Sequence, residues 1–555
     1  MPSKSIFYCL ITAIILKNFN YPNKNNMQES VKEALSAWST LLNNKIQINP
    51  ELKSCIAVKK SVIATLFPAS VKDIIECVKI ADTYKIPIYT VSTGHNWGYG
   101  SSLPVEENCI ILNLSNMNKI ISFDAKTGVI TIEPGVTQHQ LATFLDKHQH
   151  PYLIPVTGAG PDCSIVGNAI ERGYGITPYA DHFASVLSLE AILADGSLYQ
   201  SMLSKLGSQN IDTLHKWGMG PYLDGLFTQG NLGIVTQMSI ALAPTPSSVK
   251  AFFFSVKKAD DLEEIVICIQ RIIKELNGVL GSINVMNQHR VLSMTEPYPD
   301  ADQLINGLIS TAAITKMARK RQVFPWTCVG ALYGNKAVVN AAQKEIKKIL
   351  GWKAKRLIFF TPKTVSRINS ITQSTPFIKY NMIGETVTTL HKTMQLFAGR
   401  PSEIALPLAY WLTNNQPPQG TAMRPDQDDC GLIWYSPLVP MQAEKVTEFT
   451  TMVTSICIKH QIEPLITLTS FSDRSFDSTI PILFKKDDPD AVLRAHACYE
   501  ELFETGKKLG FLPYRLSIHS MSKLDKYAAI PDLLKCIKKA IDPNNILAPG
   551  RYLPK

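Results

Sequence analysis

Apolar residues in the first half of the chain recur at helical spacing in some stretches and form short β-rich runs in others. Ser70 suits a helix N-cap, with Asp73 three residues on, and the spacing that follows predicts a helix to about Ala81. Leu141 and Phe144 mark a second helix. Three β-rich runs predict strands, at residues 86–90, 110–114 and 128–132. This alternation predicts a mixed α+β lobe.

A run of proline and hydroxyl residues at 244–248 follows a predicted strand that ends near Ala243, and a new pattern of strands and long helices begins at Ala251. We therefore place a linker and a domain boundary there. A chain of 555 residues is too long for a single hydrophobic core, so at least two lobes are expected. The predicted divisions are a leader with an N-terminal helix, a first lobe, a middle lobe and a closing segment, at residues 1–44, 45–245, 246–505 and 506–555.

The bulk composition is that of an ordinary folded protein, with 45% hydrophobic and 18% charged residues. The net charge of +10 comes from basic residues that are scattered through the chain, so nucleic-acid binding is not expected. Eleven cysteines without any Cys-x-x-Cys spacing argue against a disulfide framework and against a structural zinc site. This cysteine usage favours a reducing compartment, so we expect a cytoplasmic protein.

Residues 1–16 have the charged start and apolar centre of a signal peptide. The apolar stretch is too short to span a bilayer, and no small-x-small cleavage site follows it. From Met27 the spacing predicts an amphipathic helix whose apolar face contains Ala34 and Trp38. Translation from Met27 would make residues 1–26 dispensable. A secreted or periplasmic protein is the alternative if these residues are a signal peptide.

The strand at 86–90 leads into the loop Val91-Ser-Thr-Gly-His-Asn-Trp-Gly-Tyr-Gly100, which combines three glycines with serine, threonine and histidine. Glycine permits unusual dihedrals and close approach, so such a loop lets backbone N–H groups surround an anion. The spacing differs from the dinucleotide fingerprint G-x-G-x-x-G, and an ordinary glycine-rich turn is the structural alternative. The loop resembles the diphosphate-binding loop of the vanillyl-alcohol oxidase and p-cresol methylhydroxylase family of FAD enzymes.

A second glycine-rich cluster, Val156–Tyr179, opens a short predicted helix at Ser164, which is a suitable place for an anion or a flavin edge. The resemblance implies FAD as the cofactor. It assigns FAD binding to residues of both clusters, of the turn at 134–135 and of the strand at 234–235. These residues are Ser92, Thr93, Gly94, His95, Asn96, Gly98, Pro134, Gly135, Cys163, Ser164, Gly167, Asn168, Glu171, Gly173, Ile234 and Val235. For each glycine taken alone, a tight structural turn is the alternative.

The resemblance extends over nearly the whole chain. Gly330-Ala-Leu-Tyr-Gly334 and Gly399-Arg-Pro-Ser-Glu403 are similar to landmarks of that family's middle domain. It implies an α+β, two-domain FAD-binding fold of the vanillyl-alcohol oxidase/p-cresol methylhydroxylase type. In that fold residues 45–245 and the segment 506–555 would hold FAD, and residues 246–505 would form a cap domain over the flavin ring.

Two features depart from the vanillyl-alcohol oxidase pattern. That family usually has arginine at the position of His95, and it links FAD through a histidine or tyrosine in the stretch that matches Phe471–Ile480, which has neither. The berberine-bridge branch of the superfamily instead tethers FAD at Ser-Gly-Gly-His and Cys-x-x-Val-Gly motifs. Ser92-Thr-Gly-His95 and Cys163-Ser-Ile-Val-Gly167 resemble these motifs, which implies doubly covalent FAD through His95 and Cys163. A phosphate contact for the histidine and a small buried filler for the cysteine are the alternatives.

A phenol oxidase must stabilise a phenolate, which requires hydrogen-bond donors and a permanent cation around one oxygen. By resemblance, Tyr99, Tyr514 and Arg515 occupy the family's phenolate-binding positions. Arginine suits this role because it stays charged at any working pH. For the pair at 514–515 the alternative is an amphipathic core tyrosine beside a surface arginine.

Other parts of the family's substrate site are missing. The third phenolate tyrosine matches Ile176, and the carboxylate that vanillyl-alcohol oxidase sets beside the flavin matches Ala159. Asp162 is the candidate replacement for that carboxylate, and its alternative role is to cap the helix that starts near Ser164.

We therefore expect an FAD-dependent oxidase or dehydrogenase that acts on CH–OH or CH2 groups of a 4-alkylphenol or related alcohol, by hydride transfer to flavin. Its partners would be the small-molecule substrate and an electron acceptor, either oxygen or a redox protein, and a homo-oligomeric state stays open. A berberine-bridge-like sugar or secondary-alcohol oxidase is one alternative. A non-catalytic flavin-binding electron-relay protein is another, because the carboxylate and the third tyrosine are missing.

Overall fold

The computed structural model describes residues 24–553 except 209, 376–381, 415, 419, 471 and 527–531. Residues 1–23 of the leader that is predicted at residues 1–26 therefore lie outside the described residues. Helix α2 (Lys24–Leu41) begins just before Met27, and Ala34 and Trp38 are fully buried, as their predicted helical face requires. Among the helices of the described residues, none combines the length and the apolar character that crossing a bilayer requires.

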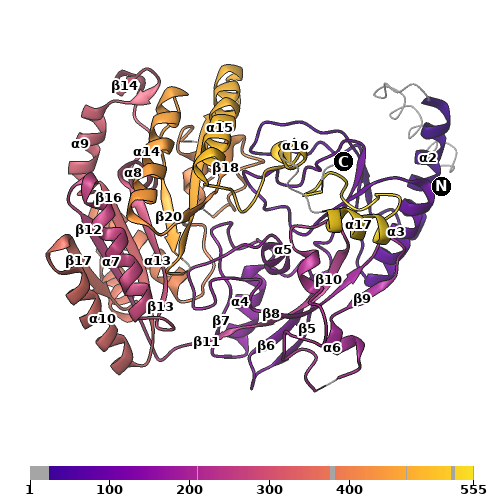
Figure 1. Ribbon diagram of the computed structural model, residues 1–555, viewed down its shortest axis with the longest axis horizontal. Helices are drawn as coiled ribbons and strands as arrows, with labels where there is room; N and C mark the ends of the chain where they lie inside the picture. The colour runs from indigo at the N-terminus through magenta and orange to yellow at the C-terminus, as the bar shows by residue number, and fades with distance from the viewer. Residues whose placement is uncertain are drawn as a thin grey trace.

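The first sheet is built around three parallel strands and has the order β1-β2-β4-β3 (Figure 1). All five residues of β2 are buried, as expected for a parallel strand that is covered on both faces. Ser70 caps α3 by accepting a hydrogen bond from the backbone N–H of Asp73, so the predicted helix is confirmed, although it runs three residues further. The elements of this part are β1 (Ile46–Ile48), β2 (Val62–Leu66), α3 (Val71–Tyr84), β3 (Ile88–Val91) and β4 (Cys109–Asn113).

The second sheet is antiparallel, with the order β5-β6-β10-β8-β9. Two helices, α4 and α5, pack their apolar residues against it and form a separate core. The elements are β5 (Ile120–Asp124), β6 (Val129–Ile132), α4 (Gln138–Lys147), α5 (Ile165–Ile170), β8 (Val186–Ile192), β9 (Leu198–Gln200), α6 (Met202–Lys205), η1 (Asp224–Phe227) and β10 (Ile234–Ala241). A two-stranded pair, β7 (Tyr152–Leu153) and β11 (Ala243–Pro244), lies beside them.

The third sheet is the largest and is antiparallel throughout. Its strand order is β17-β12-β16-β13-β20-β21-β18, and β19 also pairs with β21. Its strands are β12 (Ser248–Val256), β13 (Leu280–Asn287), β16 (Trp326–Gly334), β17 (Ala354–Phe360), β18 (Cys430–Tyr435), β19 (Leu438–Pro440), β20 (Thr467–Ser470) and β21 (Ser475–Lys485). The chain passes from the second sheet to the third between Pro244 and Ser248, where the linker is predicted. The domain boundaries themselves stay predictions.

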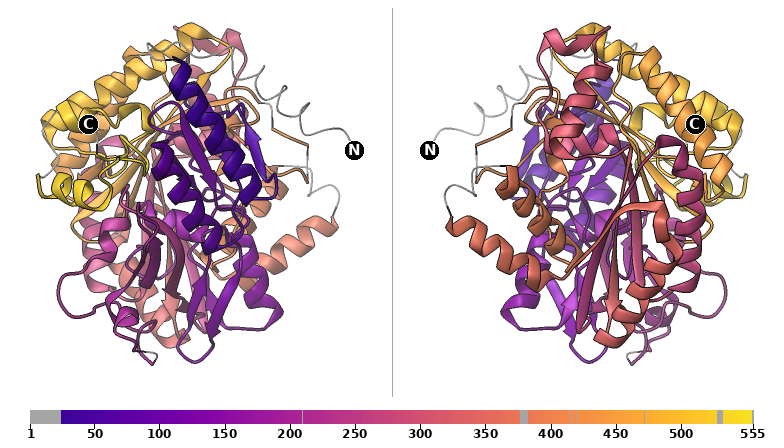
Figure 2. Two further views of the ribbon diagram at one scale, coloured as in Figure 1. Left: turned by 90° about the vertical axis from the view of Figure 1, so that its right-hand side faces the viewer. Right: turned by 90° about the vertical axis from the view of Figure 1, so that its left-hand side faces the viewer.

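Four helices cover one face of the large sheet and share its main hydrophobic core: α7 (Leu262–Glu275), α10 (Lys336–Leu350), α14 (Ala443–Lys459) and α15 (Pro489–Leu509). The opposite face contacts α11 (Pro362–Ser374) and α13 (Met382–Phe397), together with Leu153 and Ala243 of the N-terminal half. The remaining elements are η2 (Ala259–Asp261), α8 (Gln288–Thr295), η3 (Ala301–Gln303), β14 (Leu304–Ile305), β15 (Leu308–Ile309), α9 (Thr311–Arg321), η4 (Gly351–Lys353) and η5 (Leu406–Tyr410). The two views of Figure 2 look onto α2 and α3 (left) and onto the side of the large sheet (right).

After α15 the chain returns to the N-terminal half through η6 (Ile518–Ser520), α16 (Lys523–Lys526) and α17 (Asp532–Ile541) (Figure 1), and Asn544, just after α17, donates to Asp82 of α3 at 2.7 Å. The backbone of Ile88 on β3 donates to the carbonyl of Ile546 and accepts from the N–H of Ala548, both at 2.7 Å. Residues 546–548 therefore pair with β3 through one parallel bridge, and this arrangement carries the C-terminal segment to the loop that follows β3.

Candidate functional site

The glycine-rich loop after β3 is packed so closely that two of its glycines cannot be replaced without displacement. Gly94 and Gly98 have φ values of 75° and 72°. A Cβ at Gly94 would overlap the side chain of Ser102, and one at Gly98 would overlap the indole of Trp434 on β18. Because only glycine adopts this backbone freely, the sequence pattern is explained by the loop's shape. The contact with Trp434 also joins the loop to the large sheet.

The second glycine-rich cluster packs directly against this loop. Ser164 caps α5, since its Oγ accepts from the Gly167 N–H at 2.8 Å while donating to the Pro134 carbonyl at 2.6 Å. The Ser164 N–H donates to Thr93 Oγ1 at 3.1 Å, and a Cβ on Gly167 would overlap the side chain of Ser92. The structure thus brings together two clusters that lie about seventy residues apart in the sequence.

His95 and Cys163 are the residues predicted to tether FAD, and His95 contacts Asp162, the residue before Cys163. His95 Nδ1 lies 2.9 Å from the carbonyl oxygen of Asp162, next to Cys163, and its Nε2 lies 2.9 Å from a guanidinium nitrogen of Arg424. A carbonyl only accepts and a guanidinium only donates, so the imidazole is neutral with its hydrogen on Nδ1. Burial and the Arg424 charge lower the pKa of His95 to about 4, and burial raises the pKa of the Cys163 thiol to about 11.

Asp162 does not cap α5, so that alternative is wrong. Ser164 takes the cap position because its backbone is extended there and its hydroxyl reaches the Gly167 N–H. The Asp162 residue is exposed, and its backbone carbonyl, not its carboxylate, contacts His95. Its predicted catalytic role stays a prediction.

Four of the other predicted cofactor residues are closely packed or buried. Gly135 packs against the backbone of residues 114–117 and donates to the Met117 carbonyl at 2.7 Å. A Cβ on Gly173 would overlap the Asn168 side chain. On β10, Ile234 and Val235 are buried and belong to two different hydrophobic cores.

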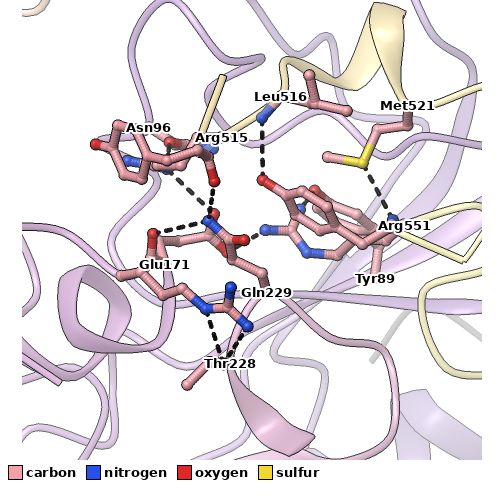
Figure 3. A network of polar contacts seen from close by, with 12 residues as sticks. Tyr89, Asn96, Glu171, Thr228, Gln229, Arg515, Leu516, Met521 and Arg551 are labelled. Carbon is pink, nitrogen blue, oxygen red and sulfur yellow. Dashed lines mark hydrogen bonds and ion pairs between the residues drawn. The ribbon is translucent and has the colours of Figure 1, made fainter. Parts of the chain in front are cut away.

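Arg515 is the centre of a buried charge network (Figure 3). Its Nη2 donates to Asn96 Oδ1 at 2.6 Å and to Glu171 Oε2 at 3.1 Å. Its guanidinium lies 4.3 Å from the ring centre of Tyr99, in cation–π contact. Only 10% of the Arg515 side chain is exposed, so the surface-arginine alternative is wrong. Burial opposes its charge, but Glu171 together with the nearby tyrosines raises the pKa of Arg515.

Glu171 lies between two arginines that both come from the C-terminal segment (Figure 3). Arg551 contacts the second oxygen of Glu171 and also the hydroxyl of Tyr89 on β3. Burial disfavours the carboxylate, but Arg551 and Arg515 together lower the pKa of Glu171. Two guanidiniums and one carboxylate leave one net positive charge in this buried region.

Three tyrosines surround this charge. The Tyr99 hydroxyl lies 2.9 Å from Ser436 Oγ, and the backbone N–H of Tyr514 donates to the Ser436 carbonyl at 3.2 Å. The ring of Tyr174 lies 5.9 Å from that of Tyr514. The structure therefore brings Tyr99, Tyr514 and Arg515 together, and it adds Tyr174, which the sequence analysis missed although it lies two residues before Ile176.

Asp477 also belongs to this group and was missed. Phe476, Ile480 and Ile482 of β21 point into the core under the helices, so Asp477 lies on the opposite face of the strand. Its side chain is hydrogen-bonded to Tyr174, and burial raises its pKa well above the usual range despite the nearby Arg515. The residue falls within the stretch 471–480, which has neither histidine nor tyrosine. Phe471 itself lies outside the described residues.

Several buried polar atoms around these loops have no hydrogen-bond partner within the described part of the chain. They are Trp97 Nε1, Ser101 Oγ, His182 Nε2, Asn231 Oδ1 and Arg515 Nε. Buried polar groups normally require a partner, and a bound cofactor or substrate is one. Together with the tightly packed glycine loops, this set of donors and acceptors fits a large polar cofactor such as FAD.

Comparisons with known proteins agree with this site. A family model described as an FAD binding domain matches residues 62–201. The 1'-carboxy-chondrochloren decarboxylase of Chondromyces crocatus is 32% identical over 492 residues, which cover 88% of this chain and 90% of that protein. The chain belongs to the family of p-cresol methylhydroxylase- and vanillyl-alcohol oxidase-type FAD-linked oxidoreductases.

Further members of this family support the assignment. The flavoprotein subunit of 4-cresol dehydrogenase [hydroxylating] from Pseudomonas putida is 29% identical over 519 residues, which cover 92% of this chain and 90% of that protein. A crystal structure of p-cresol methylhydroxylase with substrate bound superimposes with a TM-score of 0.82 at 26% identity, covering 95% and 97% of the two chains. The 4-ethylphenol oxidase of Gulosibacter chungangensis has the same fold, with a TM-score of 0.83 at 22% identity. The predicted two-domain FAD-binding fold is confirmed.

Proposed function

We propose that this FAD-linked oxidoreductase oxidises a 4-alkylphenol or a related alcohol by hydride transfer to FAD. The observation that carries the proposal is the buried guanidinium of Arg515, which lies 4.3 Å from the ring of Tyr99 and next in sequence to Tyr514. A buried cation beside hydroxyl donors is the environment that a phenolate oxygen requires. Two similar proteins are named for 4-cresol and p-cresol, which are 4-alkylphenols.

Each residue of this group has a distinct task in the proposal. Tyr99 and Tyr514 donate hydrogen bonds to the phenolate oxygen, and Arg515 provides the permanent positive charge. Asn96 and Glu171 hold the guanidinium in place through its Nη2. When bound, FAD provides the hydride acceptor. The chain's contribution is to orient the substrate carbon and to stabilise the charge that develops on the ring oxygen.

We also propose that FAD is held by the two glycine-rich clusters and bonded covalently to His95 and Cys163. Both residues lie beside Asp162, one through its carbonyl and one as its neighbour in sequence. The neutral His95 imidazole has its lone pair on Nε2, where it accepts from Arg424, and that lone pair would act as the nucleophile once this hydrogen bond is released. Each bond would replace one hydrogen of the flavin and one of the side chain, and two electrons per bond would pass to oxygen. The intact mass of the acid-denatured protein tests this proposal.

Oxidation coupled to decarboxylation is the second candidate. It is favoured by the 32% identity with a protein named as a decarboxylase of a carboxy compound. If the substrate carries a carboxylate one carbon beyond the oxidised carbon, hydride loss leaves an electron-poor ring system. Departure of CO2 then supplies the electron pair that forms a new C=C bond and restores the phenol. This step needs no protein base, which fits the presence of Ala159 at the position that, by resemblance, holds a carboxylate in vanillyl-alcohol oxidase.

Anaerobic bleaching of the holoprotein's flavin absorbance tests the function. A 4-alkylphenol should bleach the flavin, whereas its methyl ether should not, because the ether cannot form a phenolate. Arg515→Ala should slow bleaching about 10- to 100-fold, since hydrogen bonds to charged groups contribute about 1.5–3 kcal/mol. Arg515→Lys should restore part of the rate because it keeps the charge but loses the planar fork.

The same assay separates the remaining candidates. CO2 release from a carboxylated phenol would favour decarboxylation over simple oxidation. Bleaching by a sugar or secondary alcohol, with none by phenols, would favour a berberine-bridge-like oxidase. A flavin that is reduced only by a redox protein would favour electron relay and would overturn the proposed activity.

A further inference from the structure

Asp477 is a carboxyl group enclosed in the substrate region without a cation of its own. Its side chain is 1% exposed, and its Oδ1 has no hydrogen-bond partner among the described residues. Its nearest positive group, Arg515, is already hydrogen-bonded to Asn96 and Glu171. An ionised carboxylate in this position would be desolvated with one oxygen unsatisfied, which is strongly unfavourable. The geometry therefore requires a proton on Asp477.

The groups that face Asp477 come from three different segments. Tyr99 follows β3, Tyr174 follows α5, and Tyr514 and Arg515 follow α15. Its neighbours across the sheet, Thr469 on β20 and Leu438 on β19, carry no charge. One oxygen of Asp477 is hydrogen-bonded to Tyr174, so the protonated oxygen is the one without a partner. A neutral carboxylic acid of this kind has a hydrogen bond to donate, and its neighbours are tyrosines.

We propose that Asp477 is an uncharged acid of the substrate site and that it donates a hydrogen bond to the anionic oxygen of the bound substrate. This inference rests on the proposed function, because it takes the substrate to be a phenol that binds as its phenolate. Arg515 contributes the positive charge, and Asp477 contributes a donor without adding a further charge. A neutral donor keeps the buried region at one net positive charge, which matches one phenolate. Ionised, the same group would repel the phenolate.

Infrared difference spectroscopy of the holoprotein tests the inference without relying on turnover. The probe is a phenol that lacks a 4-alkyl group, so that nothing is oxidised. Its binding is followed independently through the flavin absorbance. The unliganded protein should show the C=O band of a protonated carboxylic acid, and the phenol should shift that band to lower frequency. Asp477→Asn should remove both the band and the shift.

Asp224 provides a matched control, because it is another buried carboxyl whose oxygens accept from Tyr199 and Ser201, away from the cluster of Asp477. Asp224→Asn should leave the phenol-induced shift in place. In binding titrations Asp477→Ala should weaken the phenol about tenfold, the loss of one hydrogen bond. Asp477→Asn should weaken it less, because its amide keeps a donor.

The outcomes are distinguishable. If the phenol binds but no carboxylic-acid band shifts, or if the shift survives in Asp477→Asn, this inference is overturned and the proposed function stands. If the phenol does not perturb the flavin at all, the phenolate site is wrong and both fall together.

Discussion

Glu171 is expected to hold the buried arginine pair together electrostatically, and Glu171→Gln tests this directly. The glutamine has nearly the same shape but removes the charge that lies between Arg515 and Arg551. The three side chains are only 18%, 10% and 12% exposed, so water cannot replace the lost charge. Removing one partner of a buried ion pair costs about 3–5 kcal/mol, and here two guanidiniums lose their counterion at once. We expect a loss of stability in this range.

A second substitution gives the compensation test. Arg551→Met alone leaves Glu171 with Arg515 and should cost about 1.5–3 kcal/mol, the contribution of a charged hydrogen bond. In the double variant Glu171→Gln/Arg551→Met the region again carries one positive charge, as in the natural protein. The double variant should therefore lose less stability than the sum of the two single variants, by at least about 1 kcal/mol.

Urea unfolding of the holoprotein, followed by flavin fluorescence, measures these differences. Glu275→Gln serves as the control, because its ion pair with Arg271 lies on the surface and its loss should leave the midpoint unchanged. The lowered pKa of Glu171 also predicts a pH effect. Its stabilisation is complete above the ordinary glutamate pKa and is lost as pH falls through the lower folded value, so Glu171→Gln should be less acid-sensitive. Strictly additive losses in the double variant would refute electrostatic coupling.

Two further predictions concern the cofactor and the N-terminus. After denaturation in acid, the mass of the natural protein should exceed that of its polypeptide by one FAD. His95→Ala and Cys163→Ala should each keep the adduct, and only the double variant should release it. A bare polypeptide mass for the natural protein would contradict covalent attachment. Protein translated from Met27 should match the full-length chain in flavin content and melting temperature, because the buried residues Ala34 and Trp38 are retained. A melting temperature lower by many degrees would assign a structural role to residues 1–26.

The features that the sequence predicted best depend on residues that are close together in the sequence. The cap at Ser70 and the helix after Ser164 depend on a hydroxyl that accepts from the backbone N–H three positions later, so a short window contains the signal. The capping role of Asp162 was wrong because aspartate and serine have similar cap preference, and only the backbone conformation distinguishes them. The strand β5 was missed because it is mostly exposed and carries no apolar alternation.

The part of the site that sequence analysis missed depends on contacts between distant segments. Asp477 has an ordinary position in an alternating strand, and its burial is decided by which lobe covers that face of the sheet. Arg551 falls in no recognisable motif, and its partner Glu171 was assigned to the flavin instead. Tyr174 was overlooked because the resemblance directed attention to Ile176. Burial and pairing of this kind are tertiary properties, so no local pattern reports them.

The charge network also constrains the order in which the molecule can mature. Glu171 and Arg551 are 380 residues apart in the sequence, and Arg515 and Asn96 are 419 apart. Contacts of such long range form late, because the intervening chain must first be ordered. Until the C-terminal segment has docked on β3, Glu171 lacks both of its counterions and the loop at 92–98 lacks the side chain that holds Asn96. Capture of flavin would then report completed folding, and its yield would decline in any variant that slows this final docking.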